Sequence, residues 1–318
     1  MTITLFENFR ALFYAPFYAA HALGVYEDEG LDVVLSGGDS PAVTATSLLS
    51  GEADVSWGGP MRVLYTYETT PDCDLVAFCE VVTRDPFYLI GNRPNPDFKF
   101  ADLTDMRIST VSEVPTPWLC LQDDLRRSGI DPNSLSRVDN NTMAESEAAL
   151  RAGDFDAIQV FEPHVSQLLD DDAGFVWYAA ANRGPTSYTT FYTTRNALTE
   201  KRDDLLAMTR AMYRTQIWLH AHSAQEFAEL IKSFFPDLPL TVLAAAIDRY
   251  KALGIWGANP RHAQIGFDRL DTALRSGGLI KRGATYAQCM DTSLADAVIT
   301  KDPPPAYFKR LDTVDYHE

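Results

Sequence analysis

The feature that most constrains the fold is an order of short strands and helices that occurs twice along the chain. Residues 2–57 have the pattern strand, helix, strand, helix, strand, and residues 106–160 repeat it. Strands that alternate with helices are typical of a parallel sheet covered by crossover helices. We therefore predict an α/β protein with two lobes, each built on a doubly wound sheet. The expected strands are 2–6, 31–35, 54–57, 106–110, 136–138 and 157–160, and the expected helices are 16–26, 41–50, 117–127 and 143–151.

The two copies also share a short stretch of sequence. Residues 47–60 (SLLSGEADVSWGGP) are similar to residues 148–163 (AALRAGDFDAIQVFEP). A match this short can arise by chance, but it coincides with the repeated order of elements. We interpret each stretch as a helix ended by glycine, a polar turn, and a buried strand whose carboxyl end opens into a loop. The matched positions are Gly51 and Gly153, Glu52 and Asp154, and Asp54 and Asp156, at one offset of 153 − 51 = 102 residues.

Two segments rich in β-branched and aromatic residues, 81–90 and 186–194, separate the copies from the rest of the chain. We interpret them as crossing segments, one leaving the first lobe and one returning to it. After the return, apolar residues recur at helical spacing over 200–221, 224–235, 241–253 and 262–276, which predicts a helical C-terminal part. The expected domains are lobe I from 1–92 and 188–318, and lobe II from 93–187.

The charge of the chain excludes some partners. The sequence has 27 basic and 44 acidic residues, a formal net charge of −17, so its field repels phosphate backbones and anionic membrane surfaces. Nucleic acid is therefore not expected as a partner. No stretch reaches the ~18 apolar residues of a membrane span, so direct membrane insertion is not expected either. The N-terminus lacks a secretory signal pattern, which predicts a cytoplasmic protein if the sequence is complete and a periplasmic or cell-envelope protein if a signal was removed.

The cysteines and histidines do not have the spacing of a metal site. The four cysteines form no CxxC pair, and His220 and His222 point away from each other on a helix. We predict that Cys120 and Cys289 are buried apolar residues. Whether Cys73 and Cys79 pair across a turn stays open. No metal and no cofactor are expected.

Three local patterns resemble one known family. Residues 14–33 (YAPFYAAHALGVYEDEGLDV), 49–55 (LSGEADV) and 291–297 (DTSLADA) are similar, in order, to segments of the sulfonate-, nitrate- and thiamine-precursor-binding proteins, a family that includes the thiamine pyrimidine precursor synthases. The resemblance implies a type II periplasmic-binding-protein fold that closes by a hinge around its ligand. It also implies a substrate-binding protein of an ABC-type uptake system, with an ABC permease as partner.

The alternative is a cytoplasmic enzyme on the same fold that acts on a small aromatic or heterocyclic metabolite. In the synthases a histidine lies in the first loop and a cysteine-rich run precedes the returning strand. Here Tyr14 aligns with that histidine, and Thr186, Ser187 and Tyr188 replace the cysteines. A sulfinate-cleaving relative uses a cysteine in the first lobe, whereas this chain has none before Cys73. No catalytic residue is therefore predicted, although the enzyme alternative stays open.

In open parallel sheets ligands bind beyond the carboxyl ends of the strands, so the loops there define the predicted site. Tyr14 and Tyr18 share a helix face after the first strand, as cleft wall or as core. Ser40 begins a helix whose free N–H groups suit an anion, or it only caps that helix. Trp57 offers a ring for stacking or is a core residue, and Gly58 allows close backbone approach.

In lobe II, Thr116 is expected to cap a helix and to donate to an anion. Glu162 binds an amine of the ligand or caps the next helix, and both alternatives stay open. Such a site suits a small, flat molecule that is modestly polar or anionic. The predicted ligand-binding residues are Arg10, Tyr14, Tyr18, Ser40, Trp57, Gly58, Gly59, Arg62, Arg84, Tyr88, Glu113, Thr116, Glu162 and Tyr188.

Overall fold

The computed structural model describes residues 2–37, 41–70, 72–301, 303 and 304. Its first sheet has five strands in the order β2-β1-β3-β10-β4. Strand β1 pairs in parallel with β2 and β3, whereas β10 is antiparallel to both β3 and β4. The strands are β1 (Thr2–Glu7), β2 (Asp32–Gly37), β3 (Val55–Gly58), β4 (Leu75–Val82) and β10 (Thr189–Thr194).

The second sheet has the equivalent order, β7-β6-β8-β5-β9. Strand β6 pairs in parallel with β7 and β8, and β5 is antiparallel to both β8 and β9. The strands are β5 (Tyr88–Gly91), β6 (Arg107–Ser109), β7 (Ser136–Val138), β8 (Ala157–Val160) and β9 (Phe175–Ala179). The predicted α/β architecture with two sheets is therefore confirmed.

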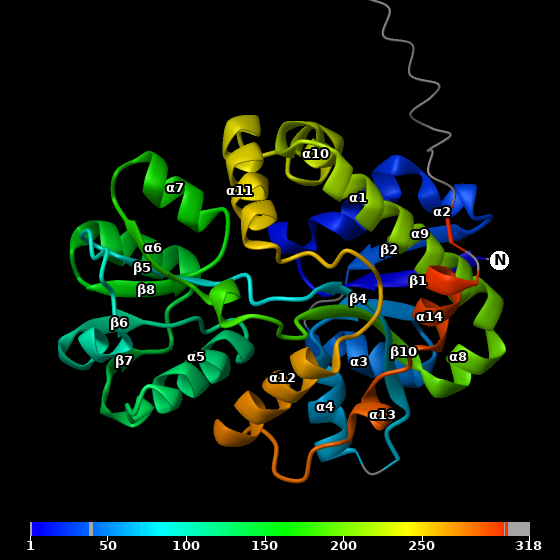
Figure 1. Ribbon diagram of the computed structural model, residues 1–318, viewed down its shortest axis with the longest axis horizontal. Helices are drawn as coiled ribbons and strands as arrows, with labels where there is room; N and C mark the ends of the chain where they lie inside the picture. The colour runs from blue at the N-terminus through cyan, green and yellow to red at the C-terminus, as the bar shows by residue number, and fades with distance from the viewer. Residues whose placement is uncertain (1, 38–40, 71, 302, 305–318) are drawn as a thin grey trace, which may run out of the picture.

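In each sheet one strand runs antiparallel to both of its neighbours. That strand is the first one that the chain forms after it has crossed from the other lobe. The chain leaves lobe I after β4 and enters the second sheet as β5, and it leaves lobe II after β9 and enters the first sheet as β10. Figure 1 shows these crossings as cyan and green segments between the two lobes. Because β5 already belongs to the second sheet, the first crossing lies over residues 83–87, just before the boundary expected at residue 92.

Helices cover both sheets, and the C-terminal part is helical as predicted. The first two helices of lobe I are α1 and α2, which the sequence analysis predicted as one helix over 16–26. They are separate because Gly24 adopts a left-handed φ of 68° between them. The helices are α1 (Ala15–Leu23), α2 (Val25–Asp28), α3 (Pro41–Ser50), α4 (Pro60–Thr69), α5 (Thr116–Arg127), α6 (Met143–Ala152), α7 (His164–Asp170), α8 (Arg195–Glu200), α9 (Arg202–Ala221), α10 (Ala224–Ile231), α11 (Leu240–Leu253), α12 (Gln264–Ser276), α13 (Tyr286–Cys289) and α14 (Ser293–Thr300).

The stretches matched at an offset of 102 residues have the same structure in both lobes. Gly51 and Gly153 follow α3 and α6 with φ of 78° and 82°. The Asp54 carboxylate accepts a hydrogen bond from the backbone N–H of Thr4 at 2.8 Å, and the Asp156 carboxylate accepts one from Arg107 at 2.9 Å. Each aspartate therefore ties the start of its own strand, β3 or β8, to the neighbouring parallel strand, β1 or β6.

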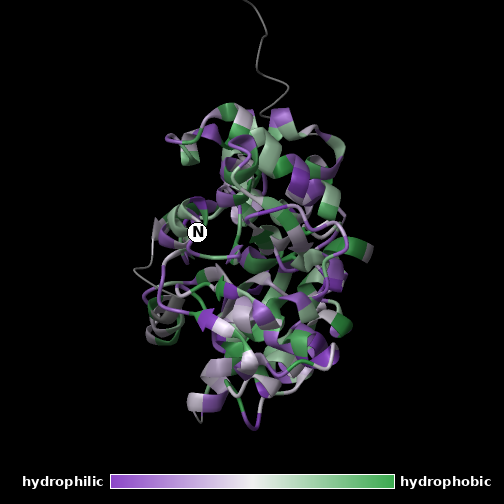
Figure 2. Ribbon diagram, turned by 90° about the vertical axis from the view of Figure 1, so that its left-hand side faces the viewer, coloured by the Kyte–Doolittle hydropathy of each residue, from purple (hydrophilic) through white to green (hydrophobic). Residues whose placement is uncertain are grey.

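The interior is apolar and the outer helices are amphipathic. Figure 2 shows hydrophilic and hydrophobic residues interspersed along the outer helices, as expected where one face is buried and the other meets water. The four cysteines are all buried and free: Cys73, Cys79, Cys120 and Cys289. Cys73 and Cys79, whose pairing the sequence left open, therefore do not form a disulfide. Within the described part of the chain, no helix combines the length and the apolar character that a membrane span requires.

Candidate functional site

A cavity of about 260 Å³ lies between the lobes. Lobe I contributes the loop after β1, the Gly58-Gly59 turn after β3, and the start of α4. Lobe II contributes the loop between β6 and α5, and the two crossing segments complete the wall. The cavity is thus at the carboxyl ends of parallel strands, where the physical argument from sequence placed the site. Seven of the predicted residues line it: Tyr14, Gly58, Gly59, Arg62, Glu113, Thr116 and Tyr188.

Aromatic rings form much of the cavity wall. Phe13 and Tyr14, in the 3₁₀ helix η1 (Leu12–Tyr14), have ring centroids 4.3 Å apart, and the Phe13 ring meets Tyr188 edge-on at 6.1 Å. Phe87, from the other crossing segment, lies 6.3 Å from Tyr188. Burial raises the pKa of both the Tyr14 and the Tyr188 phenols, so both stay neutral. The rings therefore present apolar faces and neutral hydroxyls.

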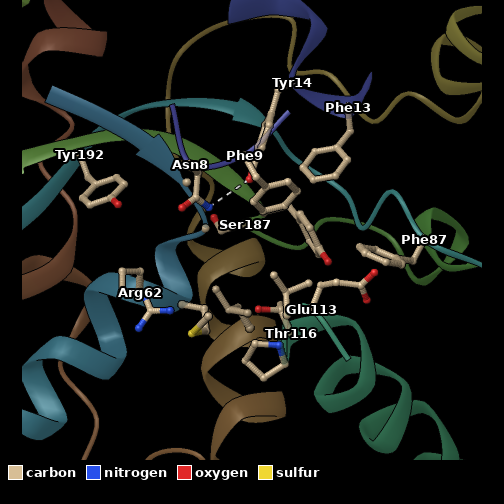
Figure 3. A pocket seen from close by; sticks show the side chains of 17 residues that line it. Asn8, Phe9, Phe13, Tyr14, Arg62, Phe87, Glu113, Thr116, Ser187 and Tyr192 are labelled. Atoms are coloured by element: carbon tan, nitrogen blue, oxygen red, sulfur yellow. Dashed lines mark hydrogen bonds between the residues drawn. The ribbon is translucent and has the colours of Figure 1, made fainter. Parts of the chain in front are cut away.

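Asn8 is a cavity residue that the sequence analysis did not select. Its side chain is buried, and its amide Nδ2 donates to the Tyr14 hydroxyl at 3.4 Å (Figure 3). Its Oδ1 atom and the Tyr188 hydroxyl have no hydrogen-bond partner among the described residues. Leaving a buried polar atom unpaired costs about 1–3 kcal/mol, so a ligand that pairs with these atoms would gain that free energy. The loop after β1 was recognised from sequence, but no sequence signal separates Asn8 from its neighbours.

Arg62 brings positive charge to the cavity. It lies in the first turn of α4, is partly buried, and has no carboxylate within salt-bridge distance in the described parts of the chain. The N-terminus of α4 also faces the cavity, with Gly59 at the N-cap and Pro60 at the first position. A Cβ atom at Gly59 would lie 3.3 Å from the Tyr188 carbonyl oxygen, so the glycine permits this close approach. Arg62 and the helix terminus together favour an anionic group.

Glu113 and Thr116 are the two predicted residues on the lobe II side of the cavity. The exposed Glu113 carboxylate accepts a hydrogen bond at 2.8 Å from the N–H of Met143, the first residue of α6. Thr116 was expected to cap α5, but it is the first residue of that helix, and the N-cap is Pro115. The expected cap was wrong because the helix begins at Thr116, one residue earlier than the Ser/Thr preference at caps suggests.

Two predicted residues from the first loop lie away from the cavity. The Arg10 guanidinium pairs with the Glu7 carboxylate at 2.6 Å and lies over the Tyr18 ring at 4.9 Å. Tyr18 also donates its hydroxyl hydrogen to Glu7 at 2.7 Å and stacks on Phe234. Tyr14 and Tyr18, one helical turn apart in sequence, therefore do not share a role: only Tyr14 lines the cavity.

Trp57 is a core residue. Its side chain is completely buried and stacks on Phe17 of α1 with ring centroids 4.8 Å apart. Tyr18 packs edge-on against the same indole at 5.7 Å. Because α1 covers the ring, Trp57 is not part of the cavity surface. Of the two alternatives weighed from sequence, its packing matches the core residue.

The remaining predicted residues have partners elsewhere. Arg84 donates to the Ala181 carbonyl oxygen at 3.3 Å, and Tyr88 in β5 stacks near Tyr250 at 6.4 Å. Glu162 is completely buried; it pairs with Arg249 at 2.7 Å and accepts from the Ser166 N–H at 2.9 Å. It thus caps α7, as one of its two predicted alternatives stated, and does not line the cavity. Ser40 lies outside the described residues.

Two lobes joined by two crossings, with a partly aromatic cavity between them, define a protein of the periplasmic-binding-protein type. The chain belongs to the NMT1/THI5-like family, whose model matches residues 13–226. This membership and the fold confirm the resemblance drawn from residues 14–33, 49–55 and 291–297.

The similarity extends over almost the whole chain. A Bacillus subtilis (strain 168) protein named "Putative binding protein YtlA" is 26% identical over 300 residues, which is 93% of this chain and 89% of that protein. The periplasmic aliphatic sulphonate binding protein SsuA of Escherichia coli superimposes with a TM-score of 0.75 at 15% identity, covering 90% of this chain and 96% of SsuA. The desulfurization enzyme DSZB superimposes with a TM-score of 0.70 at 12% identity, covering 93% of this chain and 99% of the enzyme.

Proposed function

We propose that this protein is a substrate-binding protein that holds a small, flat organic anion in the cavity between its lobes. One observation carries the proposal: aromatic rings surround a cavity into which Arg62 brings a positive charge, and no described carboxylate forms a salt bridge with it. Aromatic faces suit a flat molecule, and an unpaired guanidinium suits its anionic group. A volume of about 260 Å³ limits the ligand to the size of a small metabolite.

The proposal includes delivery of the ligand to an ABC permease. Both relatives described as binding proteins, YtlA and SsuA, match this chain over nearly its full length. Residues of both lobes line the cavity, so a ligand bound there would hold the lobes together. The lobes would then be arranged differently with and without ligand, and a permease would recognise the ligand-bound arrangement.

Calorimetry with a matched pair of probes tests the proposed ligand class. Benzenesulfonate carries a negative charge and benzylamine a positive charge on the same ring. We expect benzenesulfonate to bind and benzylamine not to bind. The variant Arg62→Gln should weaken benzenesulfonate binding at least tenfold, the scale of a lost hydrogen bond to a charged group.

The matched control is Arg10→Gln, which removes an arginine from the same lobe but outside the cavity. It should leave the affinity for benzenesulfonate within a factor of two of the wild-type value. Equal affinities of Arg62→Gln and wild type, or tighter binding of benzylamine, would contradict the proposal. A loss of affinity in Arg10→Gln would return Arg10 to the binding residues.

The second candidate is an enzyme on the same fold, for which the similarity to DSZB is the observation. Of the described residues that line the cavity, none is a cysteine, and none is a histidine that could act as a base toward Ser187 or Thr116. Binding without turnover is therefore favoured. Mass spectrometry of a bound probe after prolonged incubation decides between the two: an intact probe supports the binding protein, and a product supports the enzyme.

A further inference from the structure

A buried carboxyl group lies directly behind the cavity wall. Glu80, in β4, is only 1% exposed. Its Oε1 atom is hydrogen-bonded to the hydroxyl of Ser187, and its Oε2 atom accepts from the backbone N–H of Ala263 at 3.2 Å. Ser187 itself lines the cavity, where it lies close to Asn8 (Figure 3). One hydroxyl group therefore connects Glu80 with the space that a ligand would occupy.

No cation neutralises this carboxyl group. Within the described residues, no arginine, lysine or histidine nitrogen lies within 4 Å of it. On β10, Thr190 lies opposite Glu80, and its hydroxyl is bonded to His262 Nε2 at 2.8 Å. Burial lowers the pKa of His262 to about 3, so this imidazole is neutral at pH 7.

The other groups around Glu80 are neutral as well. Gln216 of α9 donates its amide hydrogen to the backbone oxygen of Glu80 at 3.0 Å. Burial raises the pKa of the Tyr286 phenol in α13 and of the neighbouring Cys79 thiol above their ordinary values. Burial without a compensating charge likewise raises the pKa of Glu80 to about 7. Near neutral pH this carboxyl group therefore exchanges between its charged and its protonated form.

The two forms of Glu80 leave different groups for a ligand. An ionised carboxylate only accepts hydrogen bonds, so the Ser187 hydroxyl must donate to it and can offer only lone pairs to the cavity. When Glu80 is protonated, its proton lies on Oε1, because the Ala263 N–H already occupies Oε2. Glu80 then donates to Ser187, and the hydroxyl hydrogen of Ser187 is free to turn toward the cavity.

We propose that Glu80 is a positioning residue that acts through Ser187, and that it couples the binding of an anionic ligand to the uptake of a proton. The inference rests on the proposed function, because it requires a ligand whose acceptor atom lies within reach of Ser187. Protonation converts one wall of the cavity from an acceptor to a donor and removes a negative charge behind it. Both changes favour an anion over a cation.

The test is calorimetric titration of benzenesulfonate between pH 6 and 8.5, in Bis-Tris and in Tris, two cationic buffers with different heats of ionisation. For the wild type we expect the affinity to fall about tenfold across this range. The binding heat at pH 7.5 should differ between the buffers by the heat of a fraction of a proton taken up. In Glu80→Gln, which cannot ionise, both the pH dependence and the buffer dependence should disappear.

Two further variants separate this coupling from a general effect of charge or folding. Ser187→Ala keeps the carboxyl group but removes the connecting hydroxyl, and should reduce the proton uptake. Glu7→Gln removes another buried carboxylate of lobe I, which pairs with Arg10 outside the cavity, and should leave the proton uptake unchanged. Wild-type affinity that does not vary with pH, or pH dependence that persists in Glu80→Gln, overturns the inference.

Failure of the proposed ligand class gives a different result. If benzenesulfonate binds at no pH in this range, the proposal of an anionic ligand is wrong. The inference is then decided by ¹³C NMR of the side-chain carboxyl groups, with Glu80 assigned from the signal missing in Glu80→Gln. Titration near neutral pH that Ser187→Ala shifts and Glu7→Gln does not shift supports the connection between Glu80 and Ser187 on which the coupling depends. A Glu80 carboxyl group that stays ionised down to pH 5 overturns it.

Discussion

Lobe I and lobe II share one strand order but use the ends of their strands differently. In both, a glycine with positive φ ends a helix, and an aspartate then ties the next strand to its parallel neighbour, β1 or β6. β3 ends at Gly58, and the chain continues as Gly59-Pro60 and leaves room for a ligand. After β8 the equivalent turn holds Glu162, whose charge Arg249 of α11 neutralises. The same scaffold thus builds an open wall in one lobe and an interlobe contact in the other.

The buried carboxyl groups of the two lobes show the same contrast. Glu162 has a cationic partner and a capped helix N-terminus, so its hydrogen-bonding capacity is used within the protein. Glu80 has only a serine and a backbone N–H. A site for a ligand therefore arises where the protein leaves polar groups without internal partners. Four comparisons of substitutions test how far the two lobes differ.

The largest expected effect compares Trp57 with the residue 102 positions later, Gln159. Trp57→Ala should lower the free energy of unfolding by about 3–5 kcal/mol, because it leaves a cavity between β3 and α1. Gln159→Ala removes mainly one hydrogen bond, to the Pro117 carbonyl oxygen, and should cost about 1 kcal/mol. Urea unfolding measures both values. Equal losses would show that the two positions are equivalent in packing as well as in sequence order.

The next effect concerns the ion pair of lobe II. Arg249→Met should destabilise the protein by about 3 kcal/mol, because the Glu162 carboxylate is then buried without its cation. The double variant Glu162→Gln/Arg249→Met should recover part of this loss. The free energies of unfolding of the two single variants and the double variant give the coupling energy between the residues. No coupling would mean that Glu162 is as independent of charge partners as Glu80.

Glu80, the buried carboxyl group of lobe I that has no cationic partner, should make the stability of the protein depend on pH. The pKa of Glu80 in the folded protein is about 7, above its ordinary value of 4.5, so the folded state binds this proton more tightly than the unfolded state. The wild type therefore loses stability as the pH rises from 4.5 through 7. Glu80→Gln should be more stable than the wild type by about 3 kcal/mol at pH 8, and no more stable at pH 4. Thermal unfolding at both pH values measures this difference, and an equal effect at both would rule out titration of Glu80.

The smallest expected difference is between the two aspartates. Asp54→Ala and Asp156→Ala each remove a hydrogen bond to the backbone of the neighbouring parallel strand, β1 or β6, at 2.8 Å and 2.9 Å. Each also removes an ion pair, with Lys201 or with Arg93. Both should cost about 1–2 kcal/mol, with a difference below about 0.5 kcal/mol. A larger difference in urea unfolding would break the equivalence of the lobes at the one place where sequence and structure agree most closely.

Much of the fold could be predicted because its signals are local. Apolar strands, glycines that end helices, and the order of elements predicted both sheets and the crossings between them. The break at Gly24 was missed, although glycine is itself the signal, because the apolar pattern continues across it. The position of β5 in the second sheet was also not evident, since a crossing segment and a strand within a sheet can have the same composition of β-branched and aromatic residues.

The candidate site was only partly predictable. The loops that reach the cavity follow from the rule that ligands bind beyond the carboxyl ends of strands, and Tyr14, Arg62 and Tyr188 lie there. Which side chain within a loop faces the cavity depends on its packing partners. Trp57 is covered by α1, and Arg10 is paired with Glu7, so neither reaches the cavity surface. Asn8 reaches it with nothing in the local pattern to mark it.

The sequence by itself determined the two lobes, their order of strands and helices, and the turns at Gly51 and Gly153, because these depend on neighbours within a few residues. Only the tertiary structure decided which polar groups are left for a ligand. Arg249 neutralises Glu162 from 87 positions away, and Ser187 reaches Glu80 from 107 positions away. Such pairs form only when the crossings bring distant segments together, and the free energy of a buried charge depends on whether that partner is present.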